Sequence, residues 1–185
     1  MFSWIGYLLC CWLLADFIAG VFHWVEDRYD LSNIPRFGRF LNKWITAPNR
    51  LHHDRPQSFL NNGFWYRNST NFIPAFTAAF IVLLLSPVFS TPFFMVAFGN
   101  QVHALSHSKG KVSKFTAVLQ EIGIFQSPKQ HSFHHTSPYD CNYCPMTDYL
   151  NPVLEAFNFW YRFEWVIEKT TGIKALEIPN YPPRI

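Results

Sequence analysis

The chain has 185 residues, of which 49% are hydrophobic, 19% are aromatic and only 15% are charged. An ordinary soluble protein carries about 25% charged residues, so this composition favours a membrane protein with sizeable polar segments. The net charge of +3 comes from Lys and Arg spread through loops rather than clustered on one face, which argues against a nucleic-acid-binding protein.

Two apolar regions dominate the first 105 residues. The first, from Phe2 to Trp24, is long enough to cross a bilayer, which takes about 20 residues. It lacks a basic start and a small-residue cleavage site, so it predicts a retained transmembrane helix rather than a signal peptide, and no organelle transit peptide is visible. The second region predicts a helical hairpin with arms at 72–89 and 92–105, because Ser86-Pro87 and Ser90-Thr91-Pro92 interrupt it.

Two amphipathic helices are predicted after the hairpin, over 114–125 and 152–169. The second is rich in aromatic side chains, which suit the headgroup interface of a membrane. The alternative is an ordinary cap over a soluble face. The Pro-rich tail, 178–185, is predicted to be irregular. The expected fold is all-α: one domain, residues 1–185, forming an integral membrane helical bundle of about 3–4 spans. A buried helix pair in a soluble protein is the weaker alternative for the hairpin.

The basic residues indicate how such a bundle lies in the membrane. All 15 Lys and Arg residues fall between Arg28 and Arg67 or from Lys109 onward. If the first segment crosses from outside to inside, the hairpin crosses out and back, and every basic residue lies on one side. The positive-inside rule makes that side cytoplasmic and the N-terminus extracytoplasmic.

The eight histidines form four groups along the chain, and no histidine lies outside them. Taken singly, each would be a core or surface residue more often than a ligand. Residues at i and i+4 share one face of a helix, which suits several of these pairs. With the predicted topology, all four groups lie at the same membrane face. The groups are His23 with Asp27; His52-His53; His103-x3-His107; and His131-x2-His134-His135.

The number of imidazoles indicates two metals. A zinc site needs three or four ligands, and the helix-borne H-E-x-x-H pattern of zinc hydrolases is absent. Cys141-x2-Cys144 is a single pair, so it predicts neither zinc nor a disulfide. Imidazole suits iron, and two irons (Fe) that activate O₂ fit best, because lipid tails offer only unactivated C–H bonds. All eight histidines are therefore predicted ligands.

Four other polar residues are candidates for orienting these ligands or for ligating a metal. Asp16 lies within the first apolar segment, on one helical stripe with Gly20, His23 and Asp27, and Gly20 allows close packing there. Asp16 and Asp27 could accept from ring N–H groups, although Asp16 could instead bond a neighbouring helix. The other two candidates are Asn100, which lies next to Gln101 one turn before His103, and Glu121.

The ordered set of motifs resembles the Kua or CarF lipid desaturase family over about residues 15–175. The motifs are Asp16-x3-Gly20-x2-His23-Trp24-x2-Asp27, His52-His53-x2-Pro56, Asn100-Gln101-x-His103-x3-His107, Leu119-Gln120-Glu121 and His131-x2-His134-His135-x2-Pro138. The family includes plasmanylethanolamine desaturase and a plastid desaturase acting on phosphatidylglycerol. Features of both types occur here, and the chain is shorter than the ether-lipid enzymes by one N-terminal helix.

The resemblance implies an integral membrane desaturase that uses iron, O₂ and an external electron donor such as cytochrome b5 or ferredoxin. The expected reaction removes two hydrogens from a lipid alkyl or acyl chain, which would give a vinyl ether from an alkyl-ether lipid. The expected location is a bacterial inner membrane or the endoplasmic reticulum, with the site on the cytoplasmic side. Two alternatives are a membrane lipid hydroxylase with the same irons and a non-enzymatic metal-binding membrane protein.

Overall fold

The computed structural model describes residues 3–56, 60–108 and 111–177, and within these ranges the chain is helical with no β-strand. The all-α prediction is therefore confirmed for the described residues. The predicted irregular tail, 178–185, lies outside them. The elements are α1 (Trp4–Arg28), the 3₁₀ turn η1 (Leu31–Asn33), α2 (Gly38–Leu41), the π-helical turn η2 (Asn42–Thr46), α3 (Ala47–Asp54), α5 (Phe64–Leu83), α6 (Pro87–Val96), α7 (Gly99–Ser106), α8 (Lys114–Glu121), α9 (Pro128–His134), α10 (Leu150–Ala156) and α11 (Phe159–Thr171).

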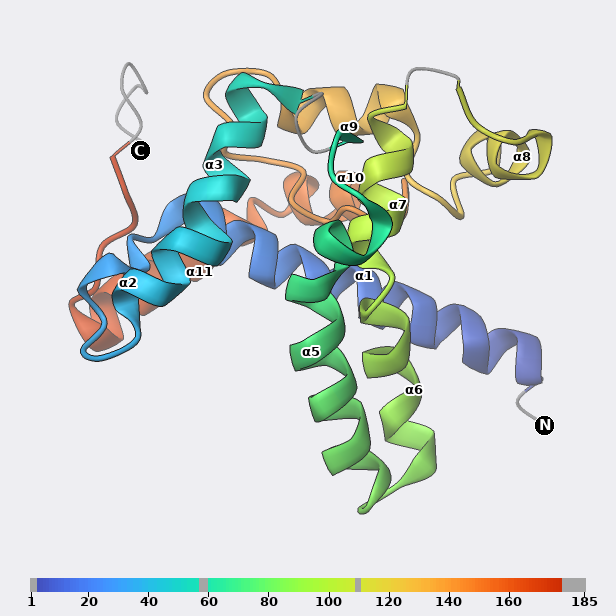
Figure 1. Ribbon diagram of the computed structural model, residues 1–185, viewed down its shortest axis with the longest axis horizontal. Helices are drawn as coiled ribbons and strands as arrows, with labels where there is room; N and C mark the ends of the chain where they lie inside the picture. Colours follow the sequence, from blue (N-terminus) through green and yellow to red (C-terminus); the bar gives the residue numbers. More distant parts are fainter. Residues whose placement is uncertain (1–2, 57–59, 109–110, 178–185) are drawn as a thin grey trace.

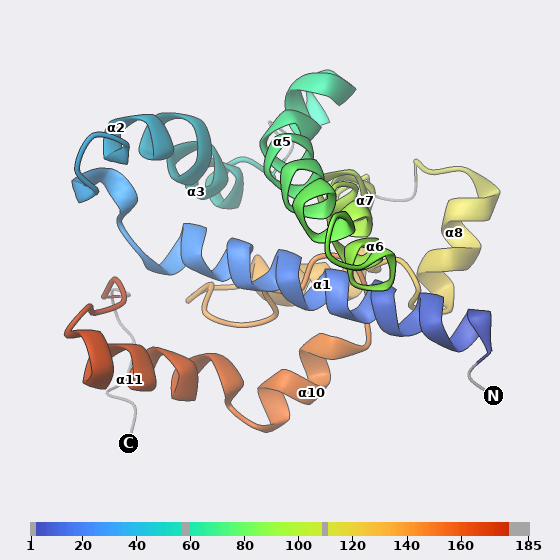
Figure 2. The same ribbon diagram turned by 90° about the horizontal axis from the view of Figure 1, so that it is seen from below.

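Helix α1 is the long element on which the other parts assemble. Its start is capped by Ser3, whose hydroxyl accepts from the Gly6 amide at 3.1 Å. It has 25 residues, and among the described helices it is the one whose length and composition would let it cross a membrane. In both views it runs across the base of a projecting hairpin formed by α5 and α6 (Figures 1 and 2).

The α5–α6 hairpin occurs where the sequence predicted one, but its bounds differ. Helix α5 begins at Phe64, and the chain turns at residues 84–86. The predicted break at Ser90-Thr91-Pro92 lies inside α6. Pro92 cannot donate to the carbonyl of Val88 four residues earlier. The hydroxyl of Tyr7 donates to that carbonyl instead, at 2.7 Å, so the proline is tolerated within the helix.

The predicted arm at 92–105 is divided between α6 and α7 by a turn at residues 97–98. Gly99 packs closely at this turn: a Cβ there would lie 3.3 Å from the Asn71 amide nitrogen and 3.6 Å from the Ala19 Cβ. The turn directs α7 away from the hairpin and past α1 (Figure 1). The histidines of α7 are therefore delivered to the body of the molecule.

Small residues form the core where α1 crosses the hairpin, because Ala15, Ala19 and Ala97 are buried there. Small side chains let two helix backbones approach closely. A second core forms where Trp24 packs against Trp160 and Tyr143.

The predicted helix 152–169 is two helices, α10 and α11. They are separated at Asn158, which adopts the left-handed conformation with φ of 49°. Asparagine tolerates this conformation better than most residues. Helix α11 is fixed to the end of α1 by Glu164, which accepts from the Arg28 guanidinium at 2.7 Å and from the Trp24 indole at 3.0 Å. This contact holds the carboxyl end of α1, which carries part of the site.

Candidate metal centre

Five histidines from three helices converge in one group. One ring nitrogen from each lies within 4.8 Å of the others. The Nε2 atoms of His103, His107 and His131 form a triangle with sides of 3.1, 3.1 and 2.9 Å. Imidazoles that bind a metal at about 2.1 Å at right angles place their nitrogens about 3 Å apart, so this triangle fits one face of a metal ion. The five are His52, His103, His107, His131 and His135.

A second group consists of His23, Asp27, His53 and His134, whose ligand atoms also lie within 4.8 Å of one another. Asp27 Oδ2 lies 3.6 Å from His23 Nε2 and 3.4 Å from His134 Nε2. Among the described residues these three buried atoms have no hydrogen-bond partner. Buried polar atoms are nearly always paired, so three orphaned atoms aimed at one point fit a bound cation.

The two histidine doublets explain why there are two groups. Successive residues on a helix differ by about 100° in direction. His52 accordingly belongs to the five-histidine group and His53 to the other, with ring centroids 4.7 Å apart. His135 and His134 divide in the same way, with centroids 5.5 Å apart. Helices α3 and α9 therefore each serve both groups, which places the two sites side by side.

Backbone carbonyls fix the orientation of three rings. The Nδ1 atom of His23 is 3.1 Å from the carbonyl oxygen of Tyr143, and that of His134 is 2.8 Å from the carbonyl oxygen of Cys141. His52 Nδ1 bonds the Asn49 carbonyl in the same way. A carbonyl can only accept, so each Nδ1 donates, and the lone pair is left on Nε2. This is the tautomer that a metal-binding histidine needs.

Four of the histidines outside α1 are held neutral. Burial, helped by the neighbouring histidines, lowers the pKa of His107 to about 4 and that of His135 to about 2. Burial likewise lowers the pKa of His52 and His131 well below the usual value. A protonated imidazole cannot ligate a metal, so neutral rings at pH 7 are ready to bind one.

Residues 12–177 match a protein-family profile described as the lipid desaturase domain. The chain belongs to the lipid desaturase family. Similar proteins include a probable fatty acid desaturase of Acanthamoeba polyphaga mimivirus, 33% identical over 88% of this chain and 82% of the relative. They also include plasmanylethanolamine desaturase 1 of Mus musculus, 30% identical over 88% of this chain and 64% of the relative.

A third relative is the chloroplastic fatty acid desaturase 4-like 1 of Arabidopsis thaliana, 31% identical over 92% of this chain and 60% of the relative. The chain thus spans less than two thirds of the mouse and plant relatives. No solved structure matches it. Membership places the chain in a family of oxidoreductases that act on lipids.

For this lipid desaturase family member, all eight predicted histidines and Asp27 fall in the two ligand groups, whereas three other candidate residues lie outside these groups. The carboxylate of Asp16 accepts from the Met146 amide at 2.7 Å and from the Thr147 hydroxyl at 2.6 Å. It anchors the loop 141–148. This role is close to the alternative that the sequence left open, in which Asp16 bonds a neighbouring helix.

Asn100 and Glu121 are the other two. The Asn100 amide donates to the Arg67 carbonyl at 2.9 Å, and Gln101 accepts from the Arg67 guanidinium at 2.8 Å, so both side chains reach α5. Glu121 is exposed on α8, which lies to one side of the molecule (Figure 1). It belongs to neither group of metal-binding candidates.

Two polar neighbours of the site were missed by the sequence analysis. The Asn49 amide donates to Asp27 Oδ1 at 2.7 Å, which leaves Oδ2 aimed between His23 and His134. Glu26 lines the cavities beside the histidines. Its position next to Asp27 in the sequence could have indicated that Glu26 lies near the site. Asn49 is three residues before His52, and nothing in the spacing connects it to Asp27.

Gly20 lies against the loop that supports two of the rings. A Cβ at this position would be 2.7 Å from the Cys144 Sγ and 3.1 Å from the Cys144 Cα. The predicted close packing at Gly20 is therefore confirmed. The loop carries the carbonyls of Tyr143 and Cys141, so its position sets the orientation of His23 and His134.

We predict that Gly20→Ala displaces this loop and lowers stability by about 1–3 kcal/mol, the usual range for overpacking a core. The melting temperature of the purified protein should fall, and metal occupancy should fall with it because two ring orientations change. Gly63→Ala is the matched control, since a Cβ there meets nothing within 4 Å. Equal melting temperatures for the two variants would contradict the prediction.

Proposed function

We propose that the protein is a membrane-bound desaturase that removes two hydrogens from adjacent carbons of a lipid alkyl or acyl chain. The supporting observation is the pair of adjacent ligand groups, one of five histidines and one of three histidines with Asp27. Two metal sites next to each other, in a chain of the lipid desaturase family, suit oxidation better than hydrolysis.

Iron is the metal that this donor set and this reaction favour together. Imidazole nitrogen and carboxylate oxygen are both good iron ligands. When bound, two irons supply the O₂ activation that side chains cannot provide. The balanced reaction takes –CH₂–CH₂–, one O₂, two electrons and two protons to –CH=CH– and two waters. The electrons come from an external donor such as cytochrome b5 or ferredoxin.

The chain's own residues orient and protect the site. The carbonyls of Asn49, Tyr143 and Cys141 hold three rings with Nε2 toward the gap between the ligands. Burial keeps His52 and His131 neutral. The burial of His103, His131 and His134 excludes bulk water from the place where a reactive oxidant would form.

The surface of the hairpin supports attachment to a membrane. Leu84 is 87% exposed and Leu85 is 83% exposed at its tip, and Phe80, Ile81 and Phe89 are exposed nearby. A contiguous apolar surface of this kind marks a lipid or protein contact. Together with the apolar helix α1, it favours an integral membrane protein of a bacterial inner membrane or the endoplasmic reticulum. The distribution of Lys and Arg favours a site on the cytoplasmic side.

Lipid mass spectrometry in a desaturase-free host tests the proposal. We expect cells that express the chain to contain lipids lighter by two hydrogens, either in acyl chains or, when an alkyl-ether lipid is supplied, as a vinyl ether. His103→Ala should abolish the product. A gain of one oxygen would identify a hydroxylase instead. Metal transport with an unchanged lipid profile would identify a non-enzymatic metal-binding protein.

A further inference from the structure

An apolar cavity of about 290 Å³ lies between α1, α5, α6 and the segment from η1 to η2, which contributes Leu31, Leu41 and Ile45. Its walls include Phe22 from α1, Pro74, Ala75 and Ala78 from α5, and Phe93 from α6. Its polar lining residues are Glu26, Thr70 and Asn71. A cavity lined in this way accepts a hydrocarbon.

A small space of about 40 Å³, the passage, borders both this cavity and the histidines. It shares Phe22, Glu26 and Val96 with the apolar cavity and adds His23 and His103 to its lining. His23 belongs to one ligand group and His103 to the other. The apolar cavity thus leads to the place where the two metal sites meet.

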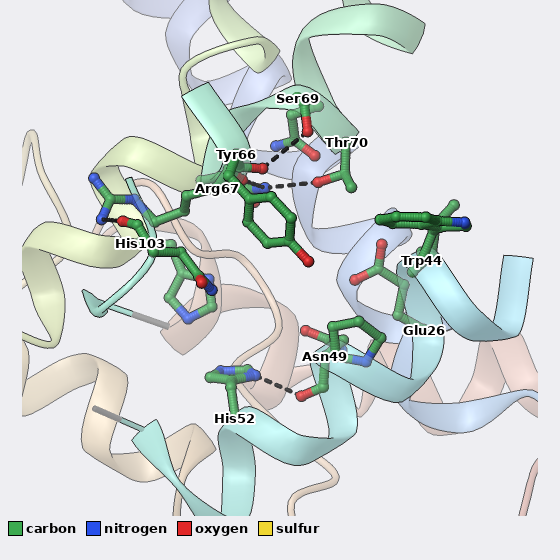
Figure 3. Close-up of a pocket in the computed structure, with 14 residues that line it drawn as sticks. Glu26, Trp44, Asn49, His52, Tyr66, Arg67, Ser69, Thr70 and His103 are labelled. Atoms are coloured by element: carbon green, nitrogen blue, oxygen red, sulfur yellow. Dashed lines mark hydrogen bonds between the residues drawn. The ribbon is translucent and has the colours of Figure 1, made fainter. Parts of the chain in front are cut away.

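A more polar cavity of about 180 Å³, the polar cavity, borders the passage and shares Asn100 and His103 with it. Figure 3 shows His52 and His103 on one side of it and Glu26 and Trp44 on the other. Arg67 also lines it, with several amide and hydroxyl side chains. Glu26 and Asn71 line all three cavities, so the polar space, the passage and the apolar space meet at these two residues.

We propose that these spaces form one lipid-binding site, in which the far end of the reacting hydrocarbon chain occupies the apolar cavity and Ala78 limits its length. This inference rests on the proposed function, because it takes the substrate to be a lipid. An amphipathic molecule matches the arrangement: its polar end fits the polar cavity, and its chain passes His103 and continues between α5 and α6.

The register of α5 places Ala78 far from the histidines. On α5 the lining residues Asn71, Ala75 and Ala78 share one face, and Ala78 lies seven residues, about 10 Å, beyond the junction at Asn71. Among the lining residues of α5, Ala78 is therefore the farthest from the junction. The small side chain of Ala78 leaves space there that a larger one would fill.

Chain-length preference tests this assignment. The wild type, Ala78→Phe and Thr77→Phe are each expressed in a host that contains equal amounts of dodecyl and octadecyl lipids. A pocket discriminates single methylenes by about tenfold or more, so Ala78→Phe should lower the long-to-short product ratio at least about tenfold. Thr77→Phe adds the same aromatic ring one residue away, on the exposed face of α5, and should keep the wild-type ratio. Phe93→Ala, which enlarges the far end, should shift the ratio toward long chains.

Photolabelling provides a second readout that does not depend on turnover. A phosphatidylethanolamine with a diazirine at the end of one alkyl chain should label α5 near Ala78 in purified wild type, and Ala78→Phe should abolish that label. Labelling there without lipid desaturation would support the binding site while rejecting the proposed function. Normal desaturation with the same chain preference in Ala78→Phe and Thr77→Phe would overturn the binding site while leaving the function intact.

Discussion

His131→Ala is expected to reduce bound iron from two per chain to about one and to lower desaturation by more than about a hundredfold. Loss of a group that only orients a ligand weakens metal binding or activity by about 10–100-fold, so loss of a ligand should exceed this. His131 is the residue to test, because its Nε2 lies 3.1 Å from that of His103 and 2.9 Å from that of His107. Elemental analysis of the purified protein and lipid mass spectrometry measure the two effects.

Ser132→Ala is the control for this variant. Ser132 is the next residue of α9, is exposed, and among the described residues its hydroxyl donates only to the Lys129 carbonyl. It should keep both irons and full activity. The helical content of the two variants should match by circular dichroism. Two irons and wild-type turnover in His131→Ala would remove His131 from the ligand set.

The sequence was sufficient to predict the histidine cluster because its members lie on helices. His23 and Asp27 are four residues apart on α1, and His103 and His107 are four apart at the end of α7, so each pair shares a face regardless of the rest of the fold. The doublets carried a further signal. Neighbouring residues on a helix point in different directions, so His52-His53 and His134-His135 indicate two adjacent groups rather than one crowded site.

The role of Asp16 could not be predicted from spacing, because it depends on a loop far away in the sequence. Its partners, Met146 and Thr147, are 130 and 131 residues away. Asp16 and His23 do share one face of α1. The loop 141–148, however, packs over the Asp16 end of that face and hydrogen-bonds the Asp16 carboxylate. Gly20, on the same face, is where Cys144 of this loop packs closely against α1.

The hairpin shows why helix bounds were harder to predict than helix positions. Apolar residues defined the arm at 72–89, yet α5 begins at Phe64 because polar residues such as Asn68 and Arg67 find partners within the fold. Pro92 predicted a helix break, but α6 continues through it because the Tyr7 hydroxyl donates to the Val88 carbonyl. In both cases a tertiary contact outweighs the local preference.

Asp27→Asn is expected to lose the metal of the second group, leaving about one iron per chain and less than about one hundredth of the activity. The amide keeps the shape of the carboxylate but removes its charge, and the four ligand atoms of this group include just one anionic oxygen. Oδ1 already accepts from the Asn49 amide and lies 3.0 Å from His53 Nε2. Oδ2 is therefore the oxygen left for a cation between His23 and His134.

The same variant separates ligation from ring orientation, the two roles that the sequence left open for Asp27. If Asp27 only orients His53, the amide oxygen of the substituted side chain can still accept from that ring, both irons should stay, and activity should fall by about 10–100-fold. Asp30→Asn, on the exposed segment after α1, should change neither the iron content nor the activity. Iron per chain thus decides the role, because an orienting carboxylate and a ligating one differ in whether the second metal remains.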